Sequence, residues 1–437
     1  MKLNNKVILI LLASMTTIFP LMSKDKVQVK LSMGANPFSH SYKVDSLVVT
    51  GEYMESDLFY KMKTYDSEEE ALLQVKYLDM SNLLIINENY DIGEYVIDNY
   101  AFRDCRTLRH IVFPKNLTTI GSHLFEECPN LHTIVLPDSL RDIRPMALVN
   151  CPTLQNVSIS PSNKFYSTHN NSLFDKNKNR LFFVPPVSTG DYTLPSQISY
   201  VEDAAFYGCN KIKTVKMSST LKSIGDFAFY RCSALSLVDI PTTVERIGSF
   251  AFFKCVSLKT IRMPKNLKTA GKFVFSGCEG LETVRIETEQ LRNDYLFAGC
   301  YKLMSFDVNE DNFSLSAKEG VLFDKKKKVL IAYPNAKGSI YEVPMSVERI
   351  GGCSFYDCIG LKNIVLPSQL KMIERAAFSN CKNLEVIKIS AVIPPSVQES
   401  SFAMVNKKKC VLYVPNNSLK TYRDHPIWGT FDNIVGF

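Results

Sequence analysis

The sequence predicts a repeat solenoid: a right-handed coil with a 23-residue period, one short parallel β-strand per coil, turns or short helical turns between strands, and a cap at each end. Two observations predict it. The residues around each repeat fit one pattern, L-x-x-[IV]-x-[ILM]-P-x-x-[LV]-x-x-I-G-x-x-A-F-x-x-C-x-x. Cysteine also returns every 23 residues in the same frame, at Cys105, Cys128 and Cys151, then at Cys209, Cys232, Cys255 and Cys278, and later at Cys358 and Cys381.

The first half of the repeat predicts a strand. In the copy that contains Leu235, Val238 and Ile240, the last two apolar residues alternate along an extended segment and face one side. Pro241 follows and ends the strand, because proline has no N–H with which to continue a ladder.

The second half of the repeat predicts a corner and a turn. Ser249 is expected to cap the turn that follows it, as Ser122, Asp203 and Asp226 do in their own repeats. Ala251, Phe252 and Cys255 have the spacing of one helical turn that faces the core. Because no coil buries its apolar face alone, the coils must stack. The stack is expected to contain a buried column of phenylalanines that share one repeat position, namely Phe229, Phe252, Phe275 and Phe378.

The cysteines are expected to form a buried, reduced ladder, because a free cysteine behaves as a small apolar residue. Coils that stack at about 4.8 Å would also permit disulfides, so distance alone leaves that alternative open. A zinc site is disfavoured, since the close pair Cys353 and Cys358 lacks a second pair or nearby histidines. Cys353 and Cys410 lie outside the ladder, their redox state is open, and they are the first candidates for any disulfide.

Two interruptions of the period are copies of each other. Cys151 to Cys209 and Cys300 to Cys358 each span 58 residues, and the two inserts align at an offset of 149. In both inserts the sequence L-F-D-K-x-K separates two apolar runs, which predicts a β-hairpin whose tip carries lysines. The run Lys325 to Lys328 has the composition of a nucleic-acid patch, but a solvated tip with lysines that protect a strand edge is the favoured interpretation.

The repeat resembles the BspA-like leucine-rich repeat family of surface and secreted proteins, which occurs in Bacteroidetes and some other microbes. The segment I-G-x-x-A-F-x-x-C in Ile247 to Cys255 carries the resemblance, which covers roughly residues 85 to 390. Departures are Arg144 and Glu202 in place of the glycine, Ser218 in place of the proline, and a coil one residue short before Cys300. They predict local distortion only. The resemblance implies a leucine-rich repeat coil and a role in adhesion to host extracellular proteins or to other cells.

The 437 residues predict one continuous repeat domain, since 46% of them are hydrophobic and no low-complexity linker divides the chain. The N-terminus predicts a secretory signal, with Lys2 and Lys6 before an apolar run that is too short to span a membrane comfortably. We therefore expect a signal peptide at residues 1–23, a flanking segment at 24–84, the solenoid at 85–390 with inserts near 160–190 and 309–338, and a C-terminal cap at 391–437. The mature chain is expected to have no integral membrane span and to be extracellular or at the cell surface.

Nothing in the sequence predicts catalysis. Phosphate-loop, serine-hydrolase and zinc-protease motifs are absent, and the six histidines are scattered. His110 and His132 are the only suggestive pair, and they are expected to be ordinary surface residues. The formal charge is +7, and it falls to +5 if residues 1–23 are removed with Lys2 and Lys6. That excess is too small to indicate nucleic acid as the main partner. We expect a non-enzymatic protein without cofactor, metal or catalytic residues.

The expected function is therefore binding, with a protein or an acidic glycan as partner and recognition spread over the coil surface. The alternative is a structural or carbohydrate-binding envelope component without a host protein partner. Exposed acidic pairs with aromatic stacking platforms would favour glycans, and a surface of mixed charge would favour protein. The identity of the ligand, the binding face, the mode of surface retention and the oligomeric state stay open. The candidate binding face is an outward basic stripe, in which Asp239 interrupts one column, formed by Lys213, Lys216, Lys259, Arg262 and Arg285. If binding does not depend on that stripe, the hairpins around Asp175 and Asp324 are the next candidates.

Overall fold

The structure is a computed structural model that describes residues 8–11, 26–31, 46–54, 75–86, 94–292 and 294–437. The chain divides into two compact units: unit 1 contains residues 1–189 and 197–211, and unit 2 contains residues 190–196 and 212–437. The predicted signal peptide, residues 1–23, lies outside the described residues apart from strand β1 (Ile8–Leu11). Across the ranges that are described, no helix has the length and apolar character needed to cross a membrane.

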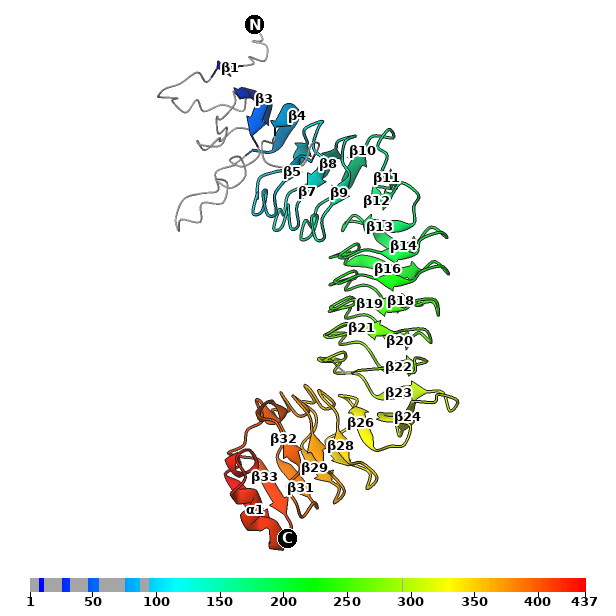
Figure 1. Ribbon diagram of the computed structural model, residues 1–437, viewed down its shortest axis with the longest axis vertical. Helices are drawn as coiled ribbons and strands as arrows, with labels where there is room; N and C mark the ends of the chain where they lie inside the picture. Colours follow the sequence, from blue (N-terminus) through cyan, green and yellow to red (C-terminus); the bar gives the residue numbers. More distant parts are fainter. Residues whose placement is uncertain (1–7, 12–25, 32–45, 55–74, 87–93, 293) are drawn as a thin grey trace. The chain divides into compact units, whose positions relative to one another are not determined.

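Unit 1 consists of stacked coils whose strands lie in rows (Figure 1). The first row is a parallel sheet made, after β1, of β2 (Lys26–Leu31), β3 (Ser46–Met54), β4 (Tyr77–Ile86), β6 (His110–Val112), β8 (Thr133–Leu136) and β10 (Asn156–Ile159). The second row is β5 (Val96–Ile97), β7 (Thr119–Ile120) and β9 (Asp142–Ile143). The first insert supplies antiparallel β11 (Tyr166–His169), β12 (Ser172–Asp175) and β13 (Arg180–Phe183), and β15 (Tyr200–Val201) pairs parallel with β13.

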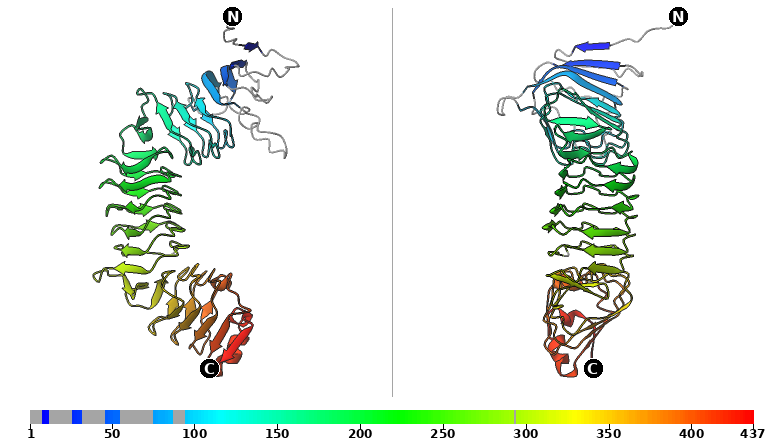
Figure 2. Two further views of the ribbon diagram at one scale, coloured as in Figure 1. Left: turned by 180° about the vertical axis from the view of Figure 1, so that it is seen from behind. Right: turned by 90° about the vertical axis from the view of Figure 1, so that its right-hand side faces the viewer.

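Unit 2 repeats this arrangement, and Figure 2 shows its successive strands running parallel. Its first row starts with β14 (Thr189–Thr193), β16 (Lys211–Lys216) and β18 (Leu237–Val238), and continues with β20 (Thr260–Met263), β22 (Thr283–Ile286) and β23 (Ser305–Val308). After the second insert it resumes with β27 (Ile340–Glu342), β29 (Asn363–Leu366), β31 (Val386–Ile389), β33 (Val411–Val414) and β34 (Asn433–Gly436).

The second row of unit 2 contains β17 (Ser223–Ile224), β19 (Arg246–Ile247) and β21 (Thr269–Ala270). Its second part begins with the antiparallel β24 (Leu315–Lys318), β25 (Val321–Asp324) and β26 (Val329–Ala332), followed by β28 (Arg349–Ile350), β30 (Met372–Ile373) and β32 (Ser396–Val397). Most coils therefore contribute two strands where the sequence predicts one. The second strand has only two residues, which is too short to show the alternation by which a strand is recognised.

The turn that contains the phenylalanine and the cysteine is not the expected helical turn. Phe250 and Lys254 have φ angles of 56° and 57°, in the left-handed region that bulky residues avoid. This backbone lets three N–H groups reach the next coil: Phe250, Phe252 and Lys254 donate to the carbonyls of Lys272, Val274 and Ser276 at 2.8–2.9 Å. A helical turn would use these groups within its own coil. The hydrogen bonds between coils offset the strain of the left-handed residues.

The expected capping residues also act between coils rather than within one. The Asp226 carboxylate accepts the N–H of Ser249, one coil further on, at 2.9 Å. Ser249 in turn accepts the N–H of Lys272 through its hydroxyl at 3.3 Å. Each of these side chains thus accepts a backbone N–H of the following coil.

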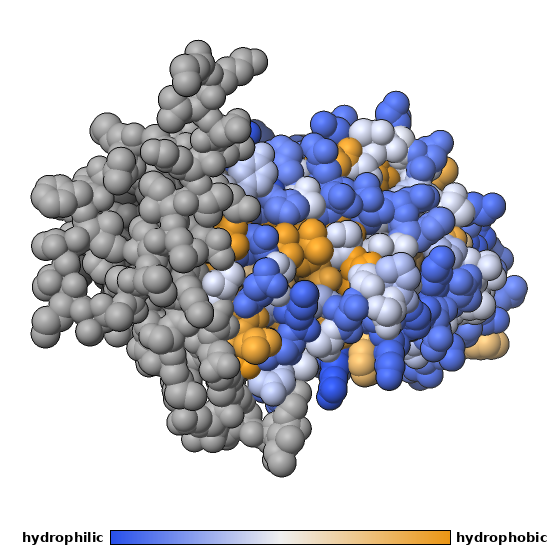
Figure 3. Space-filling model, turned by 90° about the horizontal axis from the view of Figure 1, so that it is seen from above, coloured by the Kyte–Doolittle hydropathy of each residue, from blue (hydrophilic) through white to orange (hydrophobic). Residues whose placement is uncertain are grey.

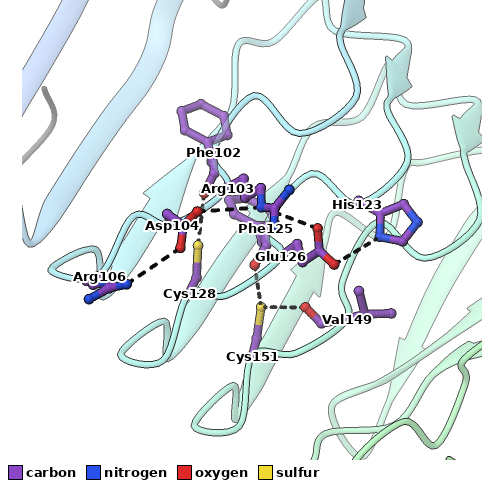
Figure 4. A network of polar contacts seen from close by, with 10 residues as sticks. All are labelled: Phe102, Arg103, Asp104, Arg106, His123, Phe125, Glu126, Cys128, Val149 and Cys151. Carbon is purple, nitrogen blue, oxygen red and sulfur yellow. Dashed lines mark hydrogen bonds and ion pairs between the residues drawn. The ribbon is translucent and has the colours of Figure 1, made fainter. Parts of the chain in front are cut away.

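All twelve cysteines are buried and no two of them form a disulfide. In most ladder positions the thiol donates to the carbonyl of the phenylalanine one coil earlier, as Cys128 does to Phe102 at 2.9 Å and Cys151 to Phe125 at 3.2 Å (Figure 4). The same Phe125 carbonyl accepts the N–H of Cys128 at 3.2 Å, so both of its lone pairs are used. The predicted reduced ladder is confirmed, and the sulfur adds a polar link between coils.

The predicted phenylalanine column is confirmed. Phe229, Phe252, Phe275 and Phe378 are each fully buried. Neighbouring rings stack, with centroids 4.9 Å apart for Phe229 and Phe252 and 5.4 Å apart for Phe252 and Phe275. The column therefore runs through the core at one ring per coil.

In contrast, the described part of the face seen in Figure 3 is mostly hydrophilic, with only small hydrophobic patches.

The glycine of the repeat marks the closest approach of two coils. A Cβ on Gly248 would lie less than 3.0 Å from Gly225 and from the backbone of Asp226 in the preceding coil. Where Arg144 and Glu202 replace this glycine, their N–H groups still donate to the preceding coil, at 3.0 and 2.9 Å. The expected local distortion therefore leaves the inter-coil hydrogen bond in place.

Both inserts form the expected hairpins, between β12 and β13 and between β25 and β26. Their first lysines differ from the expectation of solvated side chains at the tip. Lys176 donates to the carbonyls of Pro161 and Asn163 at 2.8 and 2.6 Å, and Lys325 donates to the carbonyl of Glu310 at 2.7 Å. These two lysines fold back and fasten the hairpin to the chain that leads into it.

The C-terminal end covers the last coil with short helical segments and aromatic side chains. The segments are η2 (Glu399–Phe402), η3 (Asn416–Ser418), α1 (Leu419–Arg423) and η4 (Trp428–Thr430). Tyr422 and Trp428 are fully buried and donate to the carbonyls of Ala391 and Pro395, at 2.8 and 3.0 Å. Apolar surface that another coil would cover is thereby closed.

Replacing Gly248 with alanine is expected to lower the free energy of unfolding by about 1–3 kcal/mol, because the new methyl group meets backbone that cannot move aside. Gly360 is the matched control: it is exposed, and only the Asn335 carbonyl oxygen, at 3.5 Å, lies near its would-be Cβ. Gly360→Ala should change stability by less than about 0.5 kcal/mol. Denaturant unfolding compares the two, and equal effects would contradict the close approach.

Replacing Phe252 with alanine is expected to cost about 3–5 kcal/mol, since it opens a gap in a column of stacked rings. Leu237→Ala serves as control, because this leucine lies on the same coil but is 56% exposed, and it should cost less than about 0.5 kcal/mol. Thermal melts of both variants give the measurement. A Phe252→Ala protein that melts with the wild type would show that the column does not stabilise the coil.

Candidate binding face

The candidate face consists of the outward side chains of the first row of unit 2, from β16 to β23. Residues on neighbouring strands align as the repeat predicts: Thr214 pairs with Leu237, and Arg262 pairs with Arg285. The side chains between them, such as Val215 and Ile261, point into the core and are buried. Exposed side chains therefore lie in columns that run across the coils.

The two arginines of the stripe are held by carboxylates. Arg262 forms a hydrogen-bonded ion pair with Asp239, so this aspartate does more than interrupt the column. Glu287 lies 3.9 Å from Arg262 and 3.3 Å from Arg285. Asp307 is beside Arg285 in the next strand. Charges of both signs therefore occur along this column.

Glu287 and Asp307 were missed by reasoning from the repeat. Glu287 stands just after β22, at a position that the apolar pattern does not assign to the outward face. Asp307 lies 22 residues after Arg285 because the coil between them is one residue short. The short coil was visible in the sequence, and shifting the register by one residue would have found Asp307.

The lysines of the stripe have a different environment. Lys213, Lys216 and Lys259 are exposed. None of the ion pairs found among the described residues involves any of these three side chains. They are thus the part of the stripe that has no ion pair among the described residues.

In the second row of unit 2, several charges pair across coils. Lys268 bonds to Glu245 at 2.7 Å, and the hydrogen bond from this ammonium lowers the pKa of Glu245. Glu348 lies between Lys328 and Lys371, at 2.5 and 2.7 Å, and the two ammonium groups lower its pKa to about 2. Several charges of this row are therefore paired within the molecule.

The turn side of the coils carries a half-buried aromatic ladder formed by Phe227, Phe250, Phe273 and Tyr295. Their rings stack on one another, with centroids 5.0, 5.0 and 4.7 Å apart and interplanar angles of 11° or less. Stacking uses the ring faces and leaves edges toward solvent. A sugar ring packs on an aromatic face, so the ladder does not offer the platform that would favour glycans.

The described residues contain no group of three or more His, Cys, Asp or Glu side chains placed to hold a metal ion. His132 contacts the carbonyl of Asn130 through Nδ1 at 2.5 Å, and the His110 ring lies 6.1 Å from the Tyr77 ring. Burial raises the pKa of the thiols of Cys209, Cys255 and Cys278, which opposes formation of a nucleophilic thiolate.

Glu348→Gln is expected to lower the melting temperature at neutral pH and to have no effect near pH 2. The sign follows from the lowered pKa: the carboxylate stabilises the folded chain above the ordinary glutamate pKa of about 4.3, and this contribution is lost as pH falls toward 2. Glu342→Gln is the control, an exposed glutamate without an ion pair among the described residues. Melting curves between pH 2 and 7 test this, and a difference that persists at pH 2 would contradict the pairing.

Comparison with known proteins gives one family and several similar structures. The family model described as a BspA type leucine rich repeat region matches residues 89–185, 182–304 and 332–426, in six copies. These matches cover more than half of the chain. No curated protein matches it.

Three solved structures are similar at low sequence identity. A leucine-rich repeat protein from Eubacterium ventriosum is 19% identical, with 90% of this chain and 82% of that chain covered and a TM-score of 0.44. The pneumococcal vaccine antigen PcpA is 16% identical, with 91% and 80% covered and a TM-score of 0.45. A leucine rich cell surface protein from Faecalibacterium prausnitzii is 18% identical, with 78% and 83% covered and a TM-score of 0.40. Likeness at this level carries no conclusion about function.

Proposed function

Because the chain belongs to the BspA-type leucine-rich repeat family, whose members are generally surface or protein-interaction proteins, we propose that it is an exported, non-enzymatic protein that binds a protein partner. Adhesion to extracellular matrix proteins or to another cell surface is the role that we propose. The binding face is the stripe of Lys213, Lys216, Lys259, Arg262 and Arg285 on the first row of unit 2.

The observation that carries this proposal is that three exposed lysines of the stripe have no ion pair among the described residues, whereas several lysines of the second row do have one. Across the second row, lysines and carboxylates pair with each other, as Glu348 does with Lys328 and Lys371. On the first row, Lys213, Lys216 and Lys259 have no such partner among the described residues. Exposed charges that are not paired within the molecule are available for an acidic partner and favour its approach.

The arginines contribute in a second way. Arg262 and Arg285 are already ordered by Asp239 and Glu287, so binding costs them little further loss of side-chain freedom. A partner with both acidic and basic groups fits this column of mixed charge better than a uniformly anionic polymer. The mixed charge and the edge-on aromatic ladder together favour a protein surface over a glycan.

Charge reversal at Lys213 and Lys259 together is expected to weaken binding by at least about fivefold, because each reversal replaces an attraction with a repulsion. The probes are purified extracellular matrix proteins and heparin, tested by surface plasmon resonance at low and at physiological salt. Affinity should fall as salt rises, since exposed charges are screened over about 8 Å. Melting temperatures should stay unchanged.

Lys222→Glu with Lys272→Glu is the matched control, since it changes the net charge equally at exposed sites away from the face. If both double variants weaken binding equally, net charge and not the face is responsible. If heparin binds and no matrix protein does, the partner is an acidic glycan and the protein-binding proposal is wrong. If no probe binds, adhesion is rejected in favour of a structural envelope role.

A further inference from the structure

The second insert interrupts the first row of unit 2 between β23 and β29 (Figure 1). After the insert, β27 starts a new sheet. The insert itself covers the edge of β23. The N–H of Phe306 donates to the Gly320 carbonyl at 2.8 Å, and the Leu303 carbonyl accepts the N–H of Ala336 at 2.8 Å. On this side of the interruption, the chain takes the place of the missing strand.

The edge of β27 on the other side is not covered in this way. Asn363 donates to the Ser339 carbonyl and Val343 donates to the Val365 carbonyl, both at 2.9 Å. In a parallel pair, alternate residues bond to one neighbour, so Tyr341 bonds toward β29 while the backbone groups of Ile340 and Glu342 point away. Within the described residues, no hydrogen bond reaches the backbone of Ile340 or Glu342 on that side. Two N–H groups and two carbonyls are therefore open.

This edge borders a hollow of about 530 Å³. Besides β27, its lining includes Lys318 at the end of β24, Glu319 in the turn that follows, Tyr333 and Met345. Ile340 and Met345 are 68% and 60% exposed, which is unusual for large apolar side chains placed together. The phenol oxygen of Tyr333 is buried without a hydrogen-bond partner, a state that few polar groups keep unless a ligand or water completes it.

We propose that the edge of β27 binds an extended segment of a partner protein, which adds to the sheet as one further strand. Only a polypeptide backbone offers N–H and carbonyl groups at the alternation that Ile340 and Glu342 present, so a sugar chain does not match it. The inward residue of the segment would rest beside Tyr341, whose ring lies 4.7 Å from that of Tyr333. The site therefore takes a segment with a β-branched or aromatic residue in the middle.

The neighbours of the added strand define its flanking residues. An apolar side chain fits beside Ile340, and a basic side chain fits beside Glu342. β27 has three residues, and Pro344 follows closely and cannot extend a ladder. The contact is thus short. This site is separate from the charged stripe between β16 and β22, and it does not depend on that stripe being a binding face.

The test is a selection of displayed linear peptides of about twelve random residues against the full chain, with the Glu342→Pro protein as counter-selection. Proline at this position removes an N–H that points away from β29, so the native ladder is kept and the melting temperature should not change. Selected peptides should alternate apolar or aromatic residues and lack proline. They should bind Glu342→Pro at least about tenfold more weakly than wild type, and Glu342→Gln, which keeps the N–H, nearly as well as wild type.

Peptides methylated on backbone nitrogens give a readout that does not depend on the variant folding. Methyl groups on one set of alternate residues should abolish binding, and those on the other set should not. Equal binding to wild type and Glu342→Pro, or indifference to methylation in both sets, would overturn the proposal. So would selection of no peptide. Self-association of the wild type that Glu342→Pro abolishes, without peptide binding, would make a second copy the occupant and the partner proposal wrong.

Discussion

Hydrogen bonding between the backbones of successive coils is the constraint on which the rest of the structure depends. The coils must approach so closely at Gly248 that no side chain fits between them. The adjacent turn must then take left-handed φ angles at Phe250 and Lys254 so that its N–H groups reach the next coil. Because the coils lie so close together, each buried side chain packs against the equivalent side chain of the next coil. Buried positions are therefore occupied by small or apolar residues. The sulfur of the cysteine fits the same constraint, because it donates to a carbonyl that already accepts one backbone bond.

The sequence pattern predicts burial well and partners poorly. The period, the phenylalanine column, the reduced cysteines, the hairpins and the alignment of Arg262 with Arg285 all follow from which residues are apolar and how far apart they stand, and the structure confirms them. The second row of strands, the left-handed turns and the capping across coils could not be predicted. They depend on where a backbone group of one coil meets the next, which the types of residue within a single coil do not specify. Phe250 illustrates this, since a bulky residue gives no sign of a positive φ.

The candidate site divides in the same way. Alternation along a strand predicts that the outward side chains include those of Lys213, Lys259 and Arg262. The structure places them there. Arg262 forms an ion pair with Asp239, whereas Lys213 is not paired among the described residues. This difference depends on side-chain geometry, which a repeat pattern does not specify. The open edge of β27 was likewise hidden, because the insert that creates it is recognisable in the sequence but the side that it covers is not.

Oxidation of the cysteine ladder would also report where the coils of the solenoid have separated. Each thiol is buried between neighbouring coils, so it meets solvent only when its coil separates from a neighbour. Fraying from an end and rupture in the middle would therefore leave different sulfurs modified by an oxidant. In an oxidising environment, each thiol is protected as soon as its neighbour has docked, and the order in which coils dock decides which sulfurs escape a wrong disulfide.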